Sequence, residues 1–246
     1  MDSSTQPRPQ NQNAATFKYL DVVAAFFVTV LLVSNIASSA KIVDLGISFF
    51  SVPLAFDGGT LLFPLAYVLG DILPEVYGFK VSRRVIWTGF GAMALATLTF
   101  LLLKVLPPEA FWEETAGDTA YNAILGGMSY GGIVLASFSA YLVGEFSNAV
   151  LLSKIKIAMK GRHLWVRTIA SSLVGQFLDS LIFISIATLT KVFPPELFWS
   201  LVLTNYFLKI IIEIAVLPAT YRIARLLKRT EGIDAYDVGV KYSPLP

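Results

Sequence analysis

The sequence predicts an all-α membrane protein, a six transmembrane helix bundle, and two observations support this prediction. Hydrophobic residues make up 55% of the 246-residue chain and charged residues only 15%, whereas a soluble domain has about 25% charged residues. The apolar residues also gather into six stretches, each long enough to cross about 30 Å of hydrocarbon at about 1.5 Å per residue. The absence of cysteine excludes disulfides, thiol nucleophiles and thiolate metal sites.

The six expected spans divide the chain into one transmembrane domain and two tails. The spans are residues 19–40, 59–77, 85–106, 131–153, 168–192 and 199–221. Residues 1–17 are rich in Gln, Asn, Ser and Pro, a composition typical of a disordered tail. Residues 18–229 are expected to form the transmembrane domain, and residues 230–246 a second tail.

The first span has an alternative interpretation as a cleaved signal peptide. The run Ala37-Ser38-Ser39-Ala40 resembles a small-residue cleavage site after an apolar core. Against it, the polar segment before the core is long, and Ser34 and Asn35 lie late in the span. We therefore expect this segment to remain in the protein as a transmembrane helix.

The distribution of basic residues predicts the orientation of the bundle. The segments before the first span and after the last span, together with the connections between spans 2 and 3 and spans 4 and 5, contain 15 of the 19 Lys and Arg residues. The opposite side has only Lys41, Lys104 and Lys191, together with several acids. Because basic residues are enriched on the cytoplasmic side, both termini are expected to be cytoplasmic.

Two connections on the opposite side are longer than simple turns. Residues 42–56 alternate loosely around Gly46 and Pro53, which suits either a short strand pair or a dipping loop. Residues 107–130 combine aromatic residues with acids and glycines, which favours an interfacial amphipathic helix. A lid over an outward cavity is the alternative for this second connection.

Three ionisable residues lie near the middle of three expected spans. Asp71, Asp179 and Lys209 are each about 10–12 residues into their span, roughly 15–18 Å deep. Charged residues at this depth are costly and usually face a bundle interior or an aqueous cavity. Because Lys209 can neutralise only one of the two acids, the other must bind a proton, an ion or a substrate donor.

Further polar residues share these helix faces at three- or four-residue spacing. Glu75 follows Asp71 by four residues, Gln176 precedes Asp179 by three, and Asn205 and Glu213 flank Lys209 at four. The other polar residues in the spans are Asn35, Glu145 and Asn148. Gly70, Pro74 and Gly78 interrupt the second span, as in the broken helices that line transporter sites.

Structural roles remain open for some of these residues. The amides of Asn35, Gln176 and Asn205 are also suited to bridging helices. Glu75 and Glu145 lie nearer the cytoplasmic ends, where the sequence favours ion pairs with Arg83, Arg84 or Lys154 over a role in a site.

Several short motifs occur one after another along the chain. These are Ser34-Asn35, the run Gly70-Asp71-Ile72-Leu73-Pro74-Glu75-Val76-Tyr77-Gly78 followed by Arg83-Arg84, Ala136-Ser137 with Ala140-Tyr141, then Ser171, Gln176, Asp179, Tyr206, Lys209 and Pro218. In these motifs the chain resembles the queuosine precursor transporters, also called the vitamin uptake transporter family, over about residues 19–228. Charged and glycine positions of this kind are hard to match by chance within apolar sequence.

The resemblance implies a six-helix inner-membrane protein, bacterial or archaeal, that imports 7-cyano-7-deazaguanine, 7-aminomethyl-7-deazaguanine or both for tRNA modification. Asp71, Asp179, Lys209 and Asn35 match the polar core of that family. Two positions depart from it, because Pro74 replaces an Asn of many relatives and Gln176 an Asn of some. The expected partners are a nucleobase-like small molecule and the lipid bilayer, without nucleic acid, cofactor or metal, and a homodimer is left open.

The chemistry of the polar residues fits such a substrate. A deazaguanine presents a ring N–H and an exocyclic amine that one carboxylate can accept side by side. Its carbonyl oxygen needs a donor such as Lys209, Gln176 or Asn205. Its flat ring favours an aromatic platform. The candidates for this platform are Phe177, Phe183, Tyr206 and Phe207.

Other classes of protein remain as alternatives. An intramembrane aspartyl protease would use Asp71 and Asp179 as its acids, but Val68-Leu69-Gly70-Asp71 lacks the first glycine of the Gly-x-Gly-Asp signature. A substrate-binding subunit that needs a separate energising module is also compatible, because the chain has no Walker motif. A purely structural subunit would have fully paired acids and no cavity.

Overall fold

The computed structural model describes residues 17–49, 52–129, 131–191 and 195–245. The expected disordered tail, 1–17, therefore lies outside the described residues except for its last position. In order, the elements are α1 (Leu20–Ala40), β1 (Ile42–Phe49), β2 (Val52–Asp57), the 3-10 helix η2 (Gly58–Leu62), α2 (Phe63–Ile72), the π-helix η3 (Leu73–Tyr77), α3 (Phe79–Val105), α4 (Ala110–Thr115), α5 (Gly117–Ser129), α6 (Gly131–Ala158), α7 (Leu164–Leu189), the 3-10 helix η4 (Pro195–Leu197) and α8 (Phe198–Glu231).

Five helices of the described chain are long and apolar enough to cross a membrane. These helices are α1, α3, α6, α7 and α8. Their apolar windows are only 11–28% buried within the protein, and large apolar side chains such as Phe26 and Leu98 point outward with 61% and 64% of their surface exposed. Outward apolar side chains of this kind are suited to contact with lipid.

The remaining expected span, 59–77, is a broken helix rather than one α-helix. It is divided into η2, α2 and η3, so α2 itself has only 10 residues. Pro64 lies in the first turn of α2, where the missing N–H costs nothing, but Pro74 lies inside η3. A proline removes an interior hydrogen bond, and a wider π-turn accommodates that loss.

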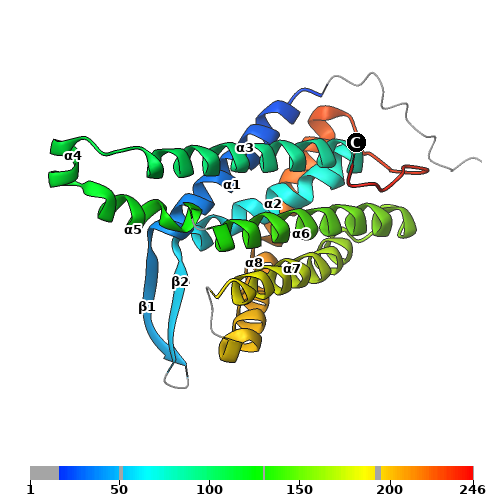
Figure 1. Cartoon of the computed structure of the whole chain (residues 1–246). Helices are drawn as coiled ribbons and strands as arrows, with labels where there is room; N and C mark the ends of the chain where they lie inside the picture. The colour runs from blue at the N-terminus through cyan, green and yellow to red at the C-terminus, as the bar shows by residue number, and fades with distance from the viewer. Residues whose placement is uncertain (1–16, 50–51, 130, 192–194, 246) are drawn as a thin grey trace, which may run out of the picture.

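The two long connections leave the bundle at the same end (Figure 1). Between α1 and η2, strands β1 and β2 pair antiparallel from Ile42 opposite Asp57 to Phe49 opposite Val52, which is the first of the two expected alternatives. Residues 107–130 contain α4 and α5, and Tyr121 of α5 donates a hydrogen bond to the Phe100 carbonyl of α3 at 2.6 Å. The C-terminus lies at the opposite end of α3 (Figure 1).

The segment after α8 folds back onto the bundle at that opposite end. Asp237 accepts hydrogen bonds from the Phe79 N–H at 2.9 Å and the Ser153 hydroxyl at 2.5 Å, which ties it to the start of α3 and to α6. The Ala235 N–H donates to the Val76 carbonyl at 3.2 Å, and the Trp87 indole donates to the Pro244 carbonyl at 2.7 Å. The C-terminal segment therefore caps the junction between η3 and α3.

Gly78 at this junction needs to be glycine for two reasons. Its φ of 83° lies in the left-handed region, and a Cβ there would lie 2.9 Å from Asp237 Oδ1 and 3.1 Å from Ala235 Cβ.

We expect Gly78→Ala to lower the free energy of unfolding by at least about 1–2 kcal/mol, the cost of a left-handed L-residue. Thermal unfolding of the purified protein in detergent, followed by tryptophan fluorescence, measures the loss. Gly91→Ala on α3 is the matched control, because a Cβ there meets nothing within 4 Å. Equal melting temperatures for the two variants would contradict the expectation.

Candidate functional site

A cavity of about 800 Å³ lies among the helices and is lined by both polar and apolar side chains. It reaches from Ser38 and Ser39 at the end of α1 to Glu213 in the middle of α8. Its polar lining consists of Ser34, Asn35, Ser38, Ser39, Tyr67, Asp71, Thr97, Ser137, Tyr141, Glu145, Asn148, Ser172, Gln176, Asp179, Ser180, Asn205, Lys209 and Glu213. A cavity with these polar groups on apolar walls, among helices with apolar outer faces, is suited to holding a small molecule inside a membrane.

Asp179 and Lys209 form an ion pair across this cavity. Lys209 donates a hydrogen bond to Asp179 Oδ2, so the pair ties α8 to α7. Their side chains are 25% and 15% exposed respectively, which leaves both accessible from the cavity. The ammonium group therefore neutralises Asp179 and not Asp71.

Asp71 is the more deeply buried acid, with only 2% of its surface exposed. Asn148 of α6 donates to Asp71 Oδ1 at 3.1 Å, and Asp71 Oδ2 has no hydrogen-bond partner among the described residues. A buried carboxylate oxygen without a donor is costly. Asp71 Oδ2 therefore has an unused capacity to accept a hydrogen bond within the described residues.

Two glycines allow α6 and α7 to approach closely beside the ion pair. A Cβ on Gly144 of α6 would lie 2.9 Å from Asp179 Cβ, and one on Gly175 of α7 would lie 3.0 Å from Asn148 Cβ. Small residues at helix contacts let membrane helices pack closely. This contact brings Asp179 and Asn148 to the same wall of the cavity.

The three predicted amide residues also line the cavity. Asn35 Nδ2 donates to the Leu31 carbonyl of its own helix at 2.8 Å, and Asn205 Nδ2 does the same to Leu201 at 3.0 Å. Gln176 lies on the cavity wall formed by α7, one turn before Asp179. Asn35 Nδ2 also contacts the Met93 sulfur at 3.9 Å, and an amide side chain can accept through its oxygen as well as donate.

Glu75 and Tyr206 do not line the cavity, although their spacing placed them on the same faces as Asp71 and Lys209. The four-residue step from Asp71 to Glu75 assumes a continuous α-helix. The π-turn η3 begins at Leu73, holds more residues per turn and points Glu75 in another direction. Tyr206 packs instead against Phe177 and Phe207, with ring centroids 5.6 and 5.4 Å away.

The aromatic residues that reach the cavity differ from most of those expected. Phe177 and Phe207 are 37% and 57% exposed and do not line it. Phe183 of α7 does, as expected, and Phe138 of α6 is an additional lining residue. The sequence analysis missed Phe138 because a phenylalanine in an apolar span has no distinctive sequence signal.

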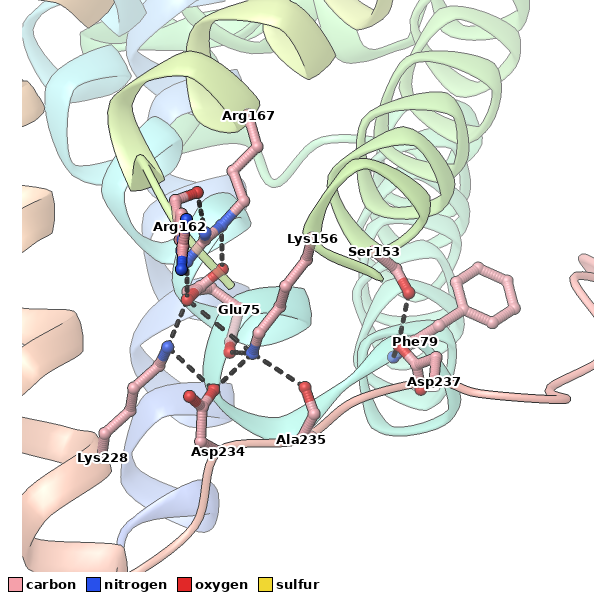
Figure 2. A network of polar contacts seen from close by, with 10 residues as sticks. All are labelled: Glu75, Phe79, Ser153, Lys156, Arg162, Arg167, Lys228, Asp234, Ala235 and Asp237. Atoms are coloured by element: carbon pink, nitrogen blue, oxygen red, sulfur yellow. Dashed lines mark hydrogen bonds and ion pairs between the residues drawn. The ribbon is translucent and has the colours of Figure 1, made fainter. Parts of the chain in front are cut away.

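Glu75 instead occupies the centre of an ion-pair cluster near the C-terminal segment (Figure 2). We call Glu75, Lys156, Arg167, Lys228 and Asp234 the Glu75 cluster. Arg167 donates to both carboxylate oxygens of Glu75, at 2.8 and 2.5 Å, and Lys228 donates to Oε1. Glu75 is 1% exposed and Arg167 2% exposed, so this pairing is fully buried.

Lys156 links the cluster to the C-terminal segment. It donates to the Glu75 carbonyl at 2.6 Å, to Asp234 Oδ1 at 2.5 Å and to the Ala235 carbonyl at 2.8 Å. Burial alone would raise the pKa of Asp234, but the charges and hydrogen bonds of Lys156 and Lys228 outweigh it and lower this pKa. Asp234 therefore stays ionised at neutral pH and holds the segment in place.

Long apolar helices around a polar cavity with buried charges define a multi-pass membrane protein of the transporter class. Comparison with known proteins supports this class. A family model described as "Putative vitamin uptake transporter" matches residues 57–223, and the chain belongs to that family. The resemblance drawn from the sequence motifs is thereby confirmed.

Named relatives agree with the family. The chain is 27% identical over 177 residues to a protein of Bacillus subtilis named "Probable queuosine precursor transporter", covering 70% of this chain and 73% of the relative. It is 25% identical over 210 residues to the "Queuosine precursor transporter" of Escherichia coli, covering 84% and 89%. No solved structure matches the chain significantly.

Proposed function

We propose that this chain imports a queuosine precursor, 7-cyano-7-deazaguanine, its 7-aminomethyl relative or both, across the inner membrane. The observation that carries the proposal is the arrangement of Asp71, Asp179 and Lys209, which line one buried cavity from three separate helices. The names of the relatives supply the substrate class.

The donor edge of a deazaguanine suits the acids of this cavity. Asp71 Oδ2 is a free acceptor among the described residues, and a ring N–H beside an exocyclic amine provides two parallel donors for a carboxylate. Lys209, Gln176 and Asn205 present donors for the carbonyl oxygen from the opposite helices. A volume of about 800 Å³ also falls within the usual range of small-molecule sites.

The proposed topology has six spans, with the broken helix η2–α2–η3 as the second, and both termini in the cytoplasm. The Glu75 cluster and most basic residues lie at the C-terminal end of the bundle, which favours that end as the cytoplasmic side. The cavity reaches toward the other end, where β1 and β2 project (Figure 1). Alternating access then requires helix groups to rock around the cavity and open the Glu75 cluster.

Uptake of a labelled precursor tests the proposal in cells that cannot synthesise it. We expect Asp179→Asn and Lys209→Met to reduce initial uptake at least about tenfold at matched expression, because each leaves a partner charge uncompensated in the cavity. Glu114→Gln is the control, because Glu114 is exposed on α4, away from the cavity lining. Unchanged accumulation in both site variants would remove the proposed site.

The alternatives predict different outcomes. An aspartyl protease would cleave a membrane substrate and lose that activity with either acid, but the Lys209–Asp179 ion pair disfavours a proton shared between Asp71 and Asp179. A substrate-binding subunit would bind the precursor without moving it in vesicles that contain this chain alone. Uptake by the purified chain in such vesicles separates the transporter from both.

A further inference from the structure

The cavity contains more acid than its one ammonium group can neutralise. Asp71, Glu145, Asp179 and Glu213 line it from α2, α6, α7 and α8, and Lys209 is the one basic residue in its described lining. With every group ionised, the cavity would have an excess of three negative charges. Because an uncompensated buried charge is expensive, at least one acid must hold a proton when no cationic ligand is bound.

Glu213 receives little support from the protein for a negative charge. It is 3% exposed, and neither of its carboxylate oxygens has a hydrogen bond that meets ordinary geometry among the described residues. Ser172 of α7 lies close enough to influence Glu213, but its hydroxyl donates to Asn148 Oδ1 at 3.5 Å. An isolated carboxylate of this kind is far more stable when it is protonated.

The elements packed around the cavity contribute further charged or titratable groups. Asp71 of α2 and Glu145 of α6 repel a negative charge on Glu213, and Glu75 of η3 acts in the same way on Asp71. The same cavity lining contains Tyr67 from α2, Tyr141 from α6, Asp179 from α7 and Lys209 on α8 itself. All except Lys209 are anionic or neutral. The surroundings therefore oppose a negative charge on Glu213, apart from the one ammonium group a single turn away.

The ammonium group of Lys209 couples the protonation of Glu213 to the ion pair in the cavity. Lys209 and Glu213 are four residues apart on α8, so their side chains are neighbours on one helix face. Lys209 is paired with Asp179 of α7. Ionised Glu213 would compete with Asp179 for the same ammonium group, and protonated Glu213 would not.

We propose that Glu213 is the proton-carrying residue of a proton-coupled import cycle. This inference rests on the proposed function. A proton from the outside solution enters through the cavity and binds Glu213, which leaves Lys209 paired with Asp179 and the site ready for substrate. When the site opens inward, Glu213 releases this proton to the cytoplasm, Lys209 turns toward Glu213, and the weakened α7–α8 tie favours substrate release.

A proton suits the arrangement better than a metal ion. The four carboxylates come from four helices, and no three acidic, histidine or cysteine side chains among the described residues converge as ligands for one ion. A single proton on one carboxylate requires no such convergence.

Purified protein in lipid vesicles tests the proposal with two assays on the same preparation. Counterflow measures exchange of labelled for unlabelled precursor without a gradient, and accumulation measures net uptake with an acidic outside solution. A one-unit pH difference sustains about a tenfold substrate ratio for one proton per substrate, or about 1.4 kcal/mol. We expect the wild type and the Glu114→Gln control to accumulate substrate to this extent, and to lose it when an ionophore dissipates the gradient.

The Glu213→Gln variant, which mimics the protonated side chain, should retain counterflow within about twofold of the wild-type rate. Its accumulation ratio should fall to about one and stop responding to pH, because the amide cannot release a proton. Accumulation equal to that of the wild type would overturn the assignment of Glu213.

Two further outcomes separate this inference from the proposed function. Wild-type counterflow without any response to a pH gradient would refute proton coupling and leave precursor transport intact, whereas absence of both activities would refute the transport function itself. If Glu213→Gln loses counterflow as well, Glu213→Asp decides the matter. Restored gradient-driven uptake in that variant supports the proton-carrying role, and continued failure overturns it.

Discussion

The Glu75→Gln variant is expected to lose about 3–5 kcal/mol of unfolding free energy, the usual cost of breaking a buried ion pair from one side. Glu75 is the carboxylate to which Arg167 and Lys228 donate, and it also lies 3.7 Å from Lys156. Removing its charge leaves Arg167 and Lys156 cationic while both remain 2% exposed. Thermal unfolding in detergent, followed by tryptophan fluorescence, measures the loss.

The matched control for this prediction is again Glu114→Gln, which removes an exposed carboxylate from α4. An unfolding free energy for Glu75→Gln within about 1 kcal/mol of the control would mean that water or Asp234 compensates the buried cations. The Glu75 cluster would then contribute little to closing that end of the bundle.

The Gly144→Leu variant is expected to reduce precursor uptake at least about tenfold and to lower stability by about 1–3 kcal/mol. A single Cβ at this position already lies 2.9 Å from Asp179 Cβ and 3.3 Å from the Gly175 carbonyl. A leucine must therefore push α7 away from α6 and displace Asp179, which weakens its pair with Lys209. Labelled uptake and thermal unfolding of the same variant measure the two effects.

Gly91→Leu is the control, because this position on α3 is exposed and a Cβ there contacts nothing within 4 Å. Wild-type uptake by Gly144→Leu would show that α6 and α7 have room to separate without disturbing the site. Close packing of these two helices would then not be what positions Asp179 for transport.

Five of the six expected spans coincide with long apolar helices in the described chain, because membrane insertion depends on long apolar runs that are visible in one sequence. The expected first span, 19–40, differs from α1 by one residue at its start. The central position of Asp71, Asp179 and Lys209 followed from counting residues along straight helices, and the structure places all three around one cavity.

The partners of Glu75 and of the C-terminal segment could not be predicted, because they depend on contacts between distant parts of the chain. Nothing local in the sequence of Asp234 or Asp237 indicates that they bind Lys156 and the start of α3, because these contacts span about 80 residues or more. The prediction paired Glu75 with Arg83, Arg84 or Lys154, whereas its partners come from α6, α7 and the end of α8.

The roles of Gly144 and Gly175 could not be predicted from the sequence. They become clear only from the contact between α6 and α7. Single glycines are common in membrane helices, so their presence in two spans does not identify which pair meets. Glu213 had a stronger signal, its four-residue spacing from Lys209. That spacing placed it on the correct face because α8 is a continuous helix there, unlike the segment around Glu75.

The wide turn at Leu73–Tyr77 affects how relatives of this chain should be aligned. A turn closed by i→i+5 hydrogen bonds contains one residue more than an ordinary turn of α-helix. A homologue whose helix runs straight through this segment therefore needs a one-residue gap there. Without that gap, every position on one side of the turn would be compared with the wrong helix face, and Asp71 or the Arg83-Arg84 pair would be assigned false equivalents.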